Sequence, residues 1–144
     1  MEKRITDFLQ KHHVLTLATC NGLQPWCANC FYTFVEDRAW LVFTSDESTR
    51  HISEAVNNTL VAGSVVLETN IVGKIQGIQF SGTVREAAED ELSTARSAYL
   101  KRFPFAVVMN TKLWILEIHH LKMTDNRLGF GKKLRWDNPK FITE

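Results

Sequence analysis

The sequence predicts a small, mainly β domain with flanking helices, in which six antiparallel strands form a barrel. Most apolar segments are short and rich in β-branched or aromatic residues, which is typical of strands. The first strands are joined by short turns, such as the hairpin signal Asn21-Gly22. No linker, repeat or low-complexity tract divides the 144 residues, so we expect one domain over 1–144.

The first half of the chain predicts a helix followed by a three-stranded meander. Ile5, Phe8, Leu9 and His12 have helical spacing, and the strands that follow are separated by short turns only. A second helix follows the third strand directly, because Ile52, with Ala55 and Val56, again has helical spacing. The predicted elements are a helix at 2–12, strands at 14–20, 25–34 and 40–45, and a helix ending near residue 58.

The second half predicts three more strands and a third helix. Gly77 and Gly82 indicate a bend or bulge in the fifth strand, whose polar residues Gln79, Ser81 and Thr83 line a site or face water. The third helix begins with acidic residues and ends before a proline. The tail at 124–136 has no clear period. The elements are strands at 60–67, 75–85 and 113–123, and a helix at 89–103.

Composition excludes several classes of protein. A hydrophobic content of 44% and a charged content of 23% are ordinary for a globular domain. The formal net charge of +1 makes nucleic acid or an anionic membrane surface an unexpected partner. The N-terminus has no apolar segment of the signal-peptide type, and no apolar run has the roughly 20 residues that a membrane span needs. We therefore expect a cytoplasmic protein.

The cysteines and histidines do not predict a metal site. An odd count of three cysteines without a secretory signal argues against a disulfide framework. Cys27 and Cys30 have CxxC spacing, but residues three apart on a strand point to opposite faces. The same geometry separates His119 from His120. We expect buried or cofactor-lining thiols and no bound metal.

The segment at 41–51 predicts either a phosphate site or an ordinary capped helix. Thr44 with Glu47 fits a capping box, and Ser45 fits the N-cap position equally well. The start of a helix offers free backbone N–H groups and a positive dipole end, and hydroxyls and one arginine gather there. A guanidinium can bind two phosphate oxygens. The residues concerned are Ser45, Ser48, Thr49 and Arg50. A well-capped surface helix remains the alternative from the motif alone.

Several segments, taken together, resemble the YhbP-type family, a functionally uncharacterised bacterial family. It lies within the pyridoxamine 5'-phosphate oxidase superfamily of FMN-binding split barrels. The resemblance spans nearly the whole chain, and the tail motif is the most specific part. The matching segments are Trp26-Cys27-Ala28-Asn29 with Phe31-Tyr32, Thr49-Arg50-His51, Gly77-Ile78-Gln79-Phe80-Ser81-Gly82, Arg102-Phe103-Pro104 and Thr124 to Lys133.

The resemblance implies a six-stranded antiparallel split β-barrel that binds FMN at a homodimer interface. It also implies the residues that contact the cofactor. The second strand lines the flavin ring, the end of the third strand contacts it, and the corner after that strand holds the phosphate. A glutamine from the fifth strand, Gln79 or alternatively Gln76, reaches the flavin. The implied cofactor-binding residues are Cys27, Ala28, Asn29, Cys30, Phe43, Thr44, Ser48, Thr49, Arg50 and Gln79, with Lys132 and Trp136 from the partner subunit.

The chain also departs from the oxidase pattern. The oxidase proper carries C-terminal arginines and a histidine that hold the substrate phosphate, and this chain has no comparable motif before Glu144. We therefore expect a flavin-dependent oxidoreductase of an unknown small molecule, and not oxidation of vitamin B6. Cys30 and His51 are the only nearby candidates for an acid or base, and packing is the alternative for both. A non-catalytic module that stores or senses flavin or haem is the second hypothesis.

Overall fold

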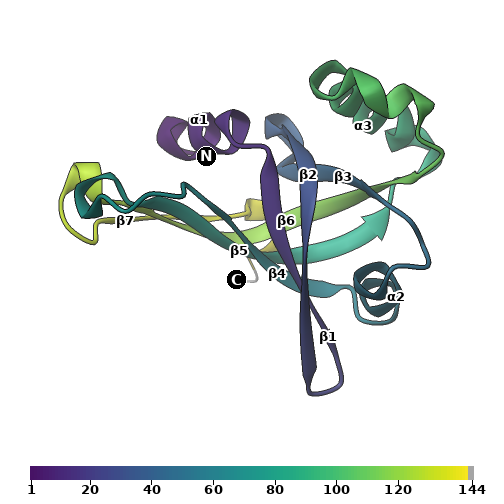
Figure 1. Cartoon of the computed structure of the whole chain (residues 1–144), viewed down its shortest axis with the longest axis horizontal. Helices are drawn as coiled ribbons and strands as arrows, with labels where there is room; N and C mark the ends of the chain where they lie inside the picture. Colours follow the sequence, from purple (N-terminus) through teal and green to yellow (C-terminus); the bar gives the residue numbers. More distant parts are fainter. Residues whose placement is uncertain (143–144) are drawn as a thin grey trace.

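The computed structural model describes residues 1–142 and confirms the mainly β architecture. Its helices are α1 (Lys3–Lys11), α2 (Arg50–Asn57) and α3 (Glu89–Arg102). Its strands are β1 (Val14–Asn21), β2 (Gln24–Val35), β3 (Trp40–Ser45), β4 (Leu60–Val66), β5 (Gln76–Glu86), β6 (Lys112–Asp125) and β7 (Lys133–Asp137). Figure 1 shows these elements in sequence colours.

The strands form one antiparallel sheet that closes on itself. The order is β3-β2-β1-β4-β5-β6-β7, and β3 also pairs with β6, so six strands make a closed ring. β7 adds to the outer edge of β6, where the sequence predicts only an aperiodic tail. Its five residues are too few, and too charged, to show a strand pattern. The predicted six-stranded split barrel is confirmed, with one further strand.

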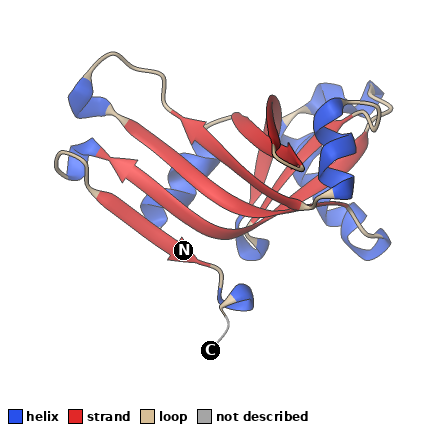
Figure 2. Ribbon diagram, turned by 90° about the horizontal axis from the view of Figure 1, so that it is seen from below, coloured by secondary structure: helices blue, strands red, loops and turns tan. Residues whose placement is uncertain are grey.

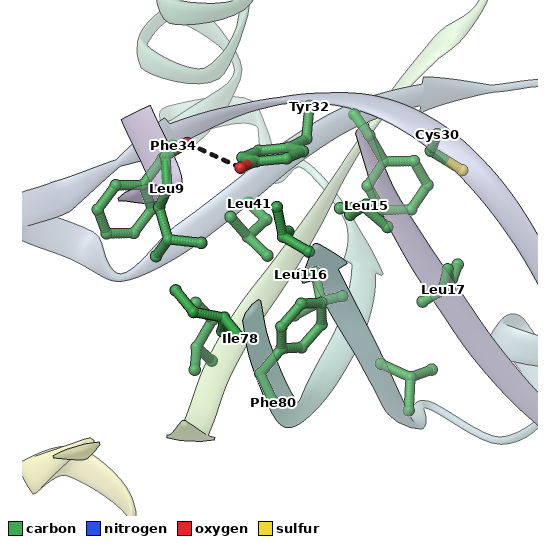
Figure 3. Packing of buried hydrophobic residues seen from close by; sticks show 14 of the residues in the cluster. Leu9, Leu15, Leu17, Cys30, Tyr32, Phe34, Leu41, Ile78, Phe80 and Leu116 are labelled. Atoms are coloured by element: carbon green, nitrogen blue, oxygen red, sulfur yellow. Dashed lines mark hydrogen bonds between the residues drawn. The ribbon is translucent and has the colours of Figure 1, made fainter. Parts of the chain in front are cut away.

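The barrel interior is filled by alternate residues of the strands. Leu15, Leu17, Ile78 and Leu116 are almost completely buried there, and α1 closes one end with Ile5 and Leu9 among the residues it contributes. The hydroxyl of Tyr32 donates a hydrogen bond to the carbonyl oxygen of Leu9 at 2.7 Å (Figure 3). This polar atom is therefore satisfied inside an apolar core.

A second, smaller core lies outside the ring under α3. Ala95 and Tyr99 of α3 pack against Trp40 and Val42 of β3 and Ile115 of β6. This helix covers only the side of the barrel formed by β2, β3 and β6. In Figure 2 the long strands have no helix in front of them except at their right-hand ends, where α2 packs against β1 and β5. The outer face of β1, β4, β5 and β7 is therefore open in one chain.

The predicted bulge in β5 is present, and the close approach of β5 to β6 explains why a glycine occupies it. The register shifts between Ser81 and Gly82, so that Ser81 is opposite His120 and Gly82 is opposite Ile118. A Cβ atom on Gly82 would overlap the carbonyl oxygen of Glu117. The strands therefore approach each other more closely here than any side chain allows.

The predicted capping box at the start of α2 is wrong. The helix begins at Arg50, with Thr49 at the N-cap position, five residues after Thr44. Residues 46–49 instead form a tight turn, in which Asp46 accepts hydrogen bonds from the Ser48 amide at 2.8 Å and the Ser48 hydroxyl at 2.5 Å. A local aspartate turn competed successfully with the helix for these residues.

Candidate functional site

A cavity with mainly apolar walls lies where β2 separates from β3. β2 pairs with β1 from Asn21↔Gln24 to Val14↔Phe31, but with β3 only over Tyr32–Val35. The far end of β3, Thr44 and Ser45, pairs with β6 instead. A cavity of about 490 Å³ occupies the gap, within the usual size range of small-molecule sites.

Four parts of the chain line this cavity, which we call the split cavity. β2 contributes one wall, the end of β3 and the start of α2 contribute the polar end, and α3 with the 3-10 segment after it contributes an aromatic and apolar roof. The lining residues are Asn29, Cys30, Phe31, Thr44, Ser45, His51, Tyr99, Phe103, Phe105, Ala106 and Met109.

Hydroxyl groups and one imidazole form a network at the polar end. The Ser45 hydroxyl lies 2.7 Å from Nε2 of His51 and 3.3 Å from the hydroxyl of Thr49. Thr49 in turn donates to the backbone oxygen of Asp46 at 2.8 Å, so its side chain does not cap the helix. The N–H groups of the first turn of α2 therefore lack a side-chain cap beside the cavity.

The titratable groups in the split cavity are uncharged at neutral pH. Burial raises the pKa of the Cys30 thiol to about 11. Burial also raises the pKa of Tyr99, although its hydrogen bond with Thr44 acts in the opposite direction. The pKa of His51 is lowered by burial, so its imidazole is neutral at pH 7. None of the lining residues is an Asp, Glu, Lys or Arg, so the site suits a largely apolar ligand.

Arg50 lies beside the split cavity, and it is not one of the residues that line it. Its Nε donates to Glu54 at 2.8 Å, and its guanidinium carbon lies 4.2 Å from the centre of the Trp26 ring. Glu54 is also held by the Thr19 hydroxyl at 2.7 Å. The Arg50 side chain is 48% exposed, and within residues 1–142 its two terminal amino groups make no hydrogen bond. The contacts with Glu54 and Trp26 fix the Arg50 side chain and leave its two terminal amino groups available to an anion.

The other predicted site residues divide into three groups. Asn29, Cys30 and Thr44 line the split cavity, and Ser48 and Thr49 lie in the turn next to it. Phe43 is completely buried in the barrel core. Cys27 and Ala28 lie further along β2, on its outer and inner faces respectively. Sequence reasoning missed Tyr99, Phe103, Phe105 and Met109, because α3 and its extension reach the cavity only through the fold.

Gln79, Lys132 and Trp136 lie away from the split cavity in one chain. Gln79 is on the open outer face, in a row of paired residues that crosses six strands, Asn29–Thr16–Ser64–Gln79–Lys122–Arg135. Lys132 lies in the turn before β7, and Trp136 packs on the opposite side of the sheet against the main core. Asn29 and Gln79 thus share one face, three strand spacings or roughly 14 Å apart.

No described helix is long and apolar enough to cross a membrane. Among residues 1–142 there is also no cluster of three or more histidine, cysteine or acidic side chains that could hold a metal ion. Cys27 is exposed and Cys30 is buried, and all three cysteines are free.

The chain is similar to known proteins in both sequence and fold. The family described as pyridoxamine 5'-phosphate oxidase matches residues 1–123. A UPF0306 protein from Yersinia pseudotuberculosis is 42% identical over 132 residues, which are 92% of this chain and 90% of that protein.

Two solved structures share the fold at low sequence identity. A heme-binding protein from Mycobacterium smegmatis matches 90% of this chain and 55% of its own, with a TM-score of 0.74 and 17% identity. An FAD-binding protein from Mesorhizobium loti matches 85% of this chain and 94% of its own, with a TM-score of 0.70 and 14% identity. With this split barrel and these sequence relatives, the chain belongs to the UPF0306 group of the pyridoxamine 5'-phosphate oxidase family.

Proposed function

We propose that this protein binds FMN in the split cavity and is a flavin-dependent oxidoreductase of the cytoplasm. The observation that carries the proposal is the cavity itself. Its uncharged, aromatic walls end at the uncapped start of a helix with hydroxyls and an arginine beside it. A flavin mononucleotide has the same division, an aromatic ring system at one end and a dianionic phosphate at the other.

The residues present fit such a ligand. Phe31 and Phe103 offer aromatic contact to a ring, and Asn29 and Thr44 offer hydrogen bonds to its polar edge. At the other end, Ser48, Thr49, the free amino groups of Arg50 and the first turn of α2 would hold the phosphate. Bound flavin supplies hydride or single-electron transfer, while the chain supplies orientation and exclusion of water.

We also propose that two copies associate through the open outer face of the sheet. Exposed apolar side chains lie on this face of β1, β2 and β4, among them Val14, Phe31, Leu60 and Val66. A second copy would cover them and bring Gln79 or Lys132 near the partner's split cavity, whereas Trp136 would stay on the inner side of the sheet. Light scattering should give twice the chain mass, and an arginine in place of Ser64, in the middle of the face, should shift it towards one chain.

The FMN proposal is tested by titrating the purified protein with FMN and following flavin fluorescence. Replacing Arg50 with alanine removes charge-assisted hydrogen bonds, each worth about 1.5–3 kcal/mol, so affinity should fall by about ten- to a hundredfold. Arg38→Ala is the matched control, because Arg38 lies before the opposite end of β3, where it forms an exposed ion pair with Asp37 and lies over the Trp40 ring, away from the split cavity. Equal FMN affinity in wild type and Arg50→Ala would refute the phosphate corner.

One observation favours haem as a second candidate ligand. His51 offers a neutral imidazole to the split cavity, and neutral imidazole is a common iron ligand. The likeness to a heme-binding protein adds support. Titration with hemin distinguishes the two ligands. A Soret shift that His51→Ala abolishes, together with no FMN binding, would favour a haem-binding module without flavin turnover.

The departures from the oxidase pattern limit the substrate. The chain lacks the C-terminal arginines and histidine of the oxidase proper, so we propose that vitamin B6 phosphates are not its substrates. We further propose that it is of the YhbP type, because the tail motif Asp125-Asn126-Arg127 matches that family. In the structure, the buried Asp125 side chain accepts two hydrogen bonds from the Arg127 guanidinium, at 2.9 and 2.7 Å. This gives the motif a structural role in the β6–β7 turn.

A further inference from the structure

A second, much smaller cavity adjoins the split cavity behind Tyr99. It has about 20 Å³ of space, and it shares Thr44, Tyr99, Ala106 and Met109 with the larger one. Its remaining walls are Arg96, Leu100, Thr111 and Leu113. Thr44 and Tyr99 therefore stand between the two spaces, with their hydroxyls 3.3 Å apart.

The hydroxyl of Thr111 is the unusual atom in this small cavity. It is buried, and within residues 1–142 it is the one buried side-chain N or O atom with no hydrogen-bond partner. Folded proteins rarely leave a hydroxyl buried and unpaired, because the hydrogen bonds that it made with water are then not replaced. The atom therefore indicates a ligand that satisfies it.

The size and the polar groups of the cavity identify that ligand as water. A space of 20 Å³ holds one water molecule and is too small for two. A buried water needs two to four polar partners, and the lining offers the hydroxyls of Thr111, Thr44 and Tyr99 and the guanidinium of Arg96. Arg96 is exposed and stands at the solvent end of this group.

We propose that one ordered water, held by Thr111, links solvent at Arg96 to the hydroxyl of Tyr99, and that Tyr99 delivers a proton into the split cavity. The water and the tyrosine hydroxyl form a short hydrogen-bonded path between the two spaces. The catalytic part of this inference rests on the proposed flavin function, whereas the water site does not.

Such a path would supply the proton that a two-electron reduction of a small molecule requires. A carbonyl or quinone substrate gains one hydride and one proton, so that its C=O group becomes C–OH. Bound reduced flavin would supply the hydride, at the expense of a nicotinamide nucleotide, and Oη of Tyr99 would supply the proton. The tyrosinate then regains a proton from the adjacent water, which exchanges with solvent.

The surrounding groups make Tyr99 the suitable donor. The titratable and charged groups that face the same spaces are Cys30 from β2, His51 from α2 and Arg96 from α3. The raised pKa of Tyr99 keeps its proton in place until a substrate oxygen develops negative charge. Cys30 does not line the small cavity, so a water held there could not return a proton to it.

The water site is tested by neutron diffraction on crystals soaked in heavy water, with no flavin present. Wild type and Thr111→Ser should show one ordered water between Thr111 and Tyr99, with deuterium on Oη of Tyr99. Thr111→Val, which has nearly the same volume, should lack the water. A dry cavity in wild type would overturn the proposal.

The role of Tyr99 is tested on flavin-loaded protein. Tyr99→Phe, assayed at saturating FMN, should slow reduction of a quinone by at least about a hundredfold, the usual contribution of a general acid. Thr111→Val should slow it less and lower its solvent isotope effect, whereas Thr111→Ser should restore both. A wild-type rate in Tyr99→Phe overturns the proton-donor role. Failure of the wild type to bind FMN would instead refute the proposed function and leave the diffraction result valid.

Discussion

The two parts of β2, which we call its free half (residues 24–31) and its closed half (residues 32–35), pair with different strands. Residues 32–35 pair with β3, Tyr32 also donates a hydrogen bond to His13 just before β1, and all four residues are buried. Residues 24–31 pair with β1 alone, and Trp26 and Phe31 are about half exposed. In the first case a strand covers the edge of β2. In the second, the edge is free and the split cavity lies beside it.

This difference shows that a site can arise from the end of a strand pairing and not from a special motif. β3 leaves β2 after Phe43, and its remaining residues, Thr44 and Ser45, stay paired with Leu113 and Lys112 of β6. The hydroxyls of Thr44 and Ser45 are then available to side chains from α3 and α2. The closed half holds the barrel together, and the free half provides the space for a ligand.

The largest expected contrast is between the two cysteines of the free half. Cys30 is 7% exposed and its pKa is about 11, so at pH 8 about one thiol in a thousand is ionised. Cys27 is exposed on the same strand. Mass spectrometry should show alkylation of Cys27 at least a hundredfold faster than that of Cys30. Comparable rates would mean that the cavity wall opens readily.

In the closed part of the barrel, a larger side chain at a tightly packed position should lower the free energy of unfolding. Gly82→Ala forces a methyl group against the Glu117 carbonyl and should destabilise the protein by about 3 kcal/mol. Gly77→Ala, on the same strand, is the matched control, because its Cβ would lie 3.5 Å from the nearest atom and the expected cost is within about 1 kcal/mol. Urea unfolding measures both values, and equal costs would contradict the close strand approach.

The smallest expected effect concerns Glu54, which fastens α2 beside the free half of β2. Its pKa is lowered by the hydrogen bond from Thr19 and then by that from Arg50. A lowered carboxylate pKa contributes stability that is present above the unfolded value of about 4.3 and is lost as the pH falls through the folded value. The stability difference between wild type and Glu54→Gln should therefore shrink below about pH 4 in urea titrations. A constant difference from pH 7 to pH 3 would contradict this role.

The sequence predicts most of the elements, and its errors have local physical reasons. Alternation of apolar residues locates the six ring strands, and Gly82 correctly signals the bulge. The capping box at Thr44 is wrong because Asp46 forms a competing turn. β7 is missed because its five residues are too few and too charged to show a strand pattern, and it forms a strand only by pairing with β6. Among the residues that line the split cavity, the resemblance pointed to Asn29, Cys30 and Thr44. Tyr99 and Phe103 could not be recognised as lining residues, because their spacing is that of ordinary core residues in a helix.

The sequence by itself determined which segments become strands and helices, since those depend on the spacing of apolar residues and on turn chemistry a few residues apart. It also determined that thiols, hydroxyls and one arginine occur near the ends of β2 and β3. The tertiary structure decided which of these share a space. The split cavity and the unpaired hydroxyl of Thr111 exist because α3, β3 and β6 meet there. Such meetings depend on strand register and helix packing between residues that are distant along the chain.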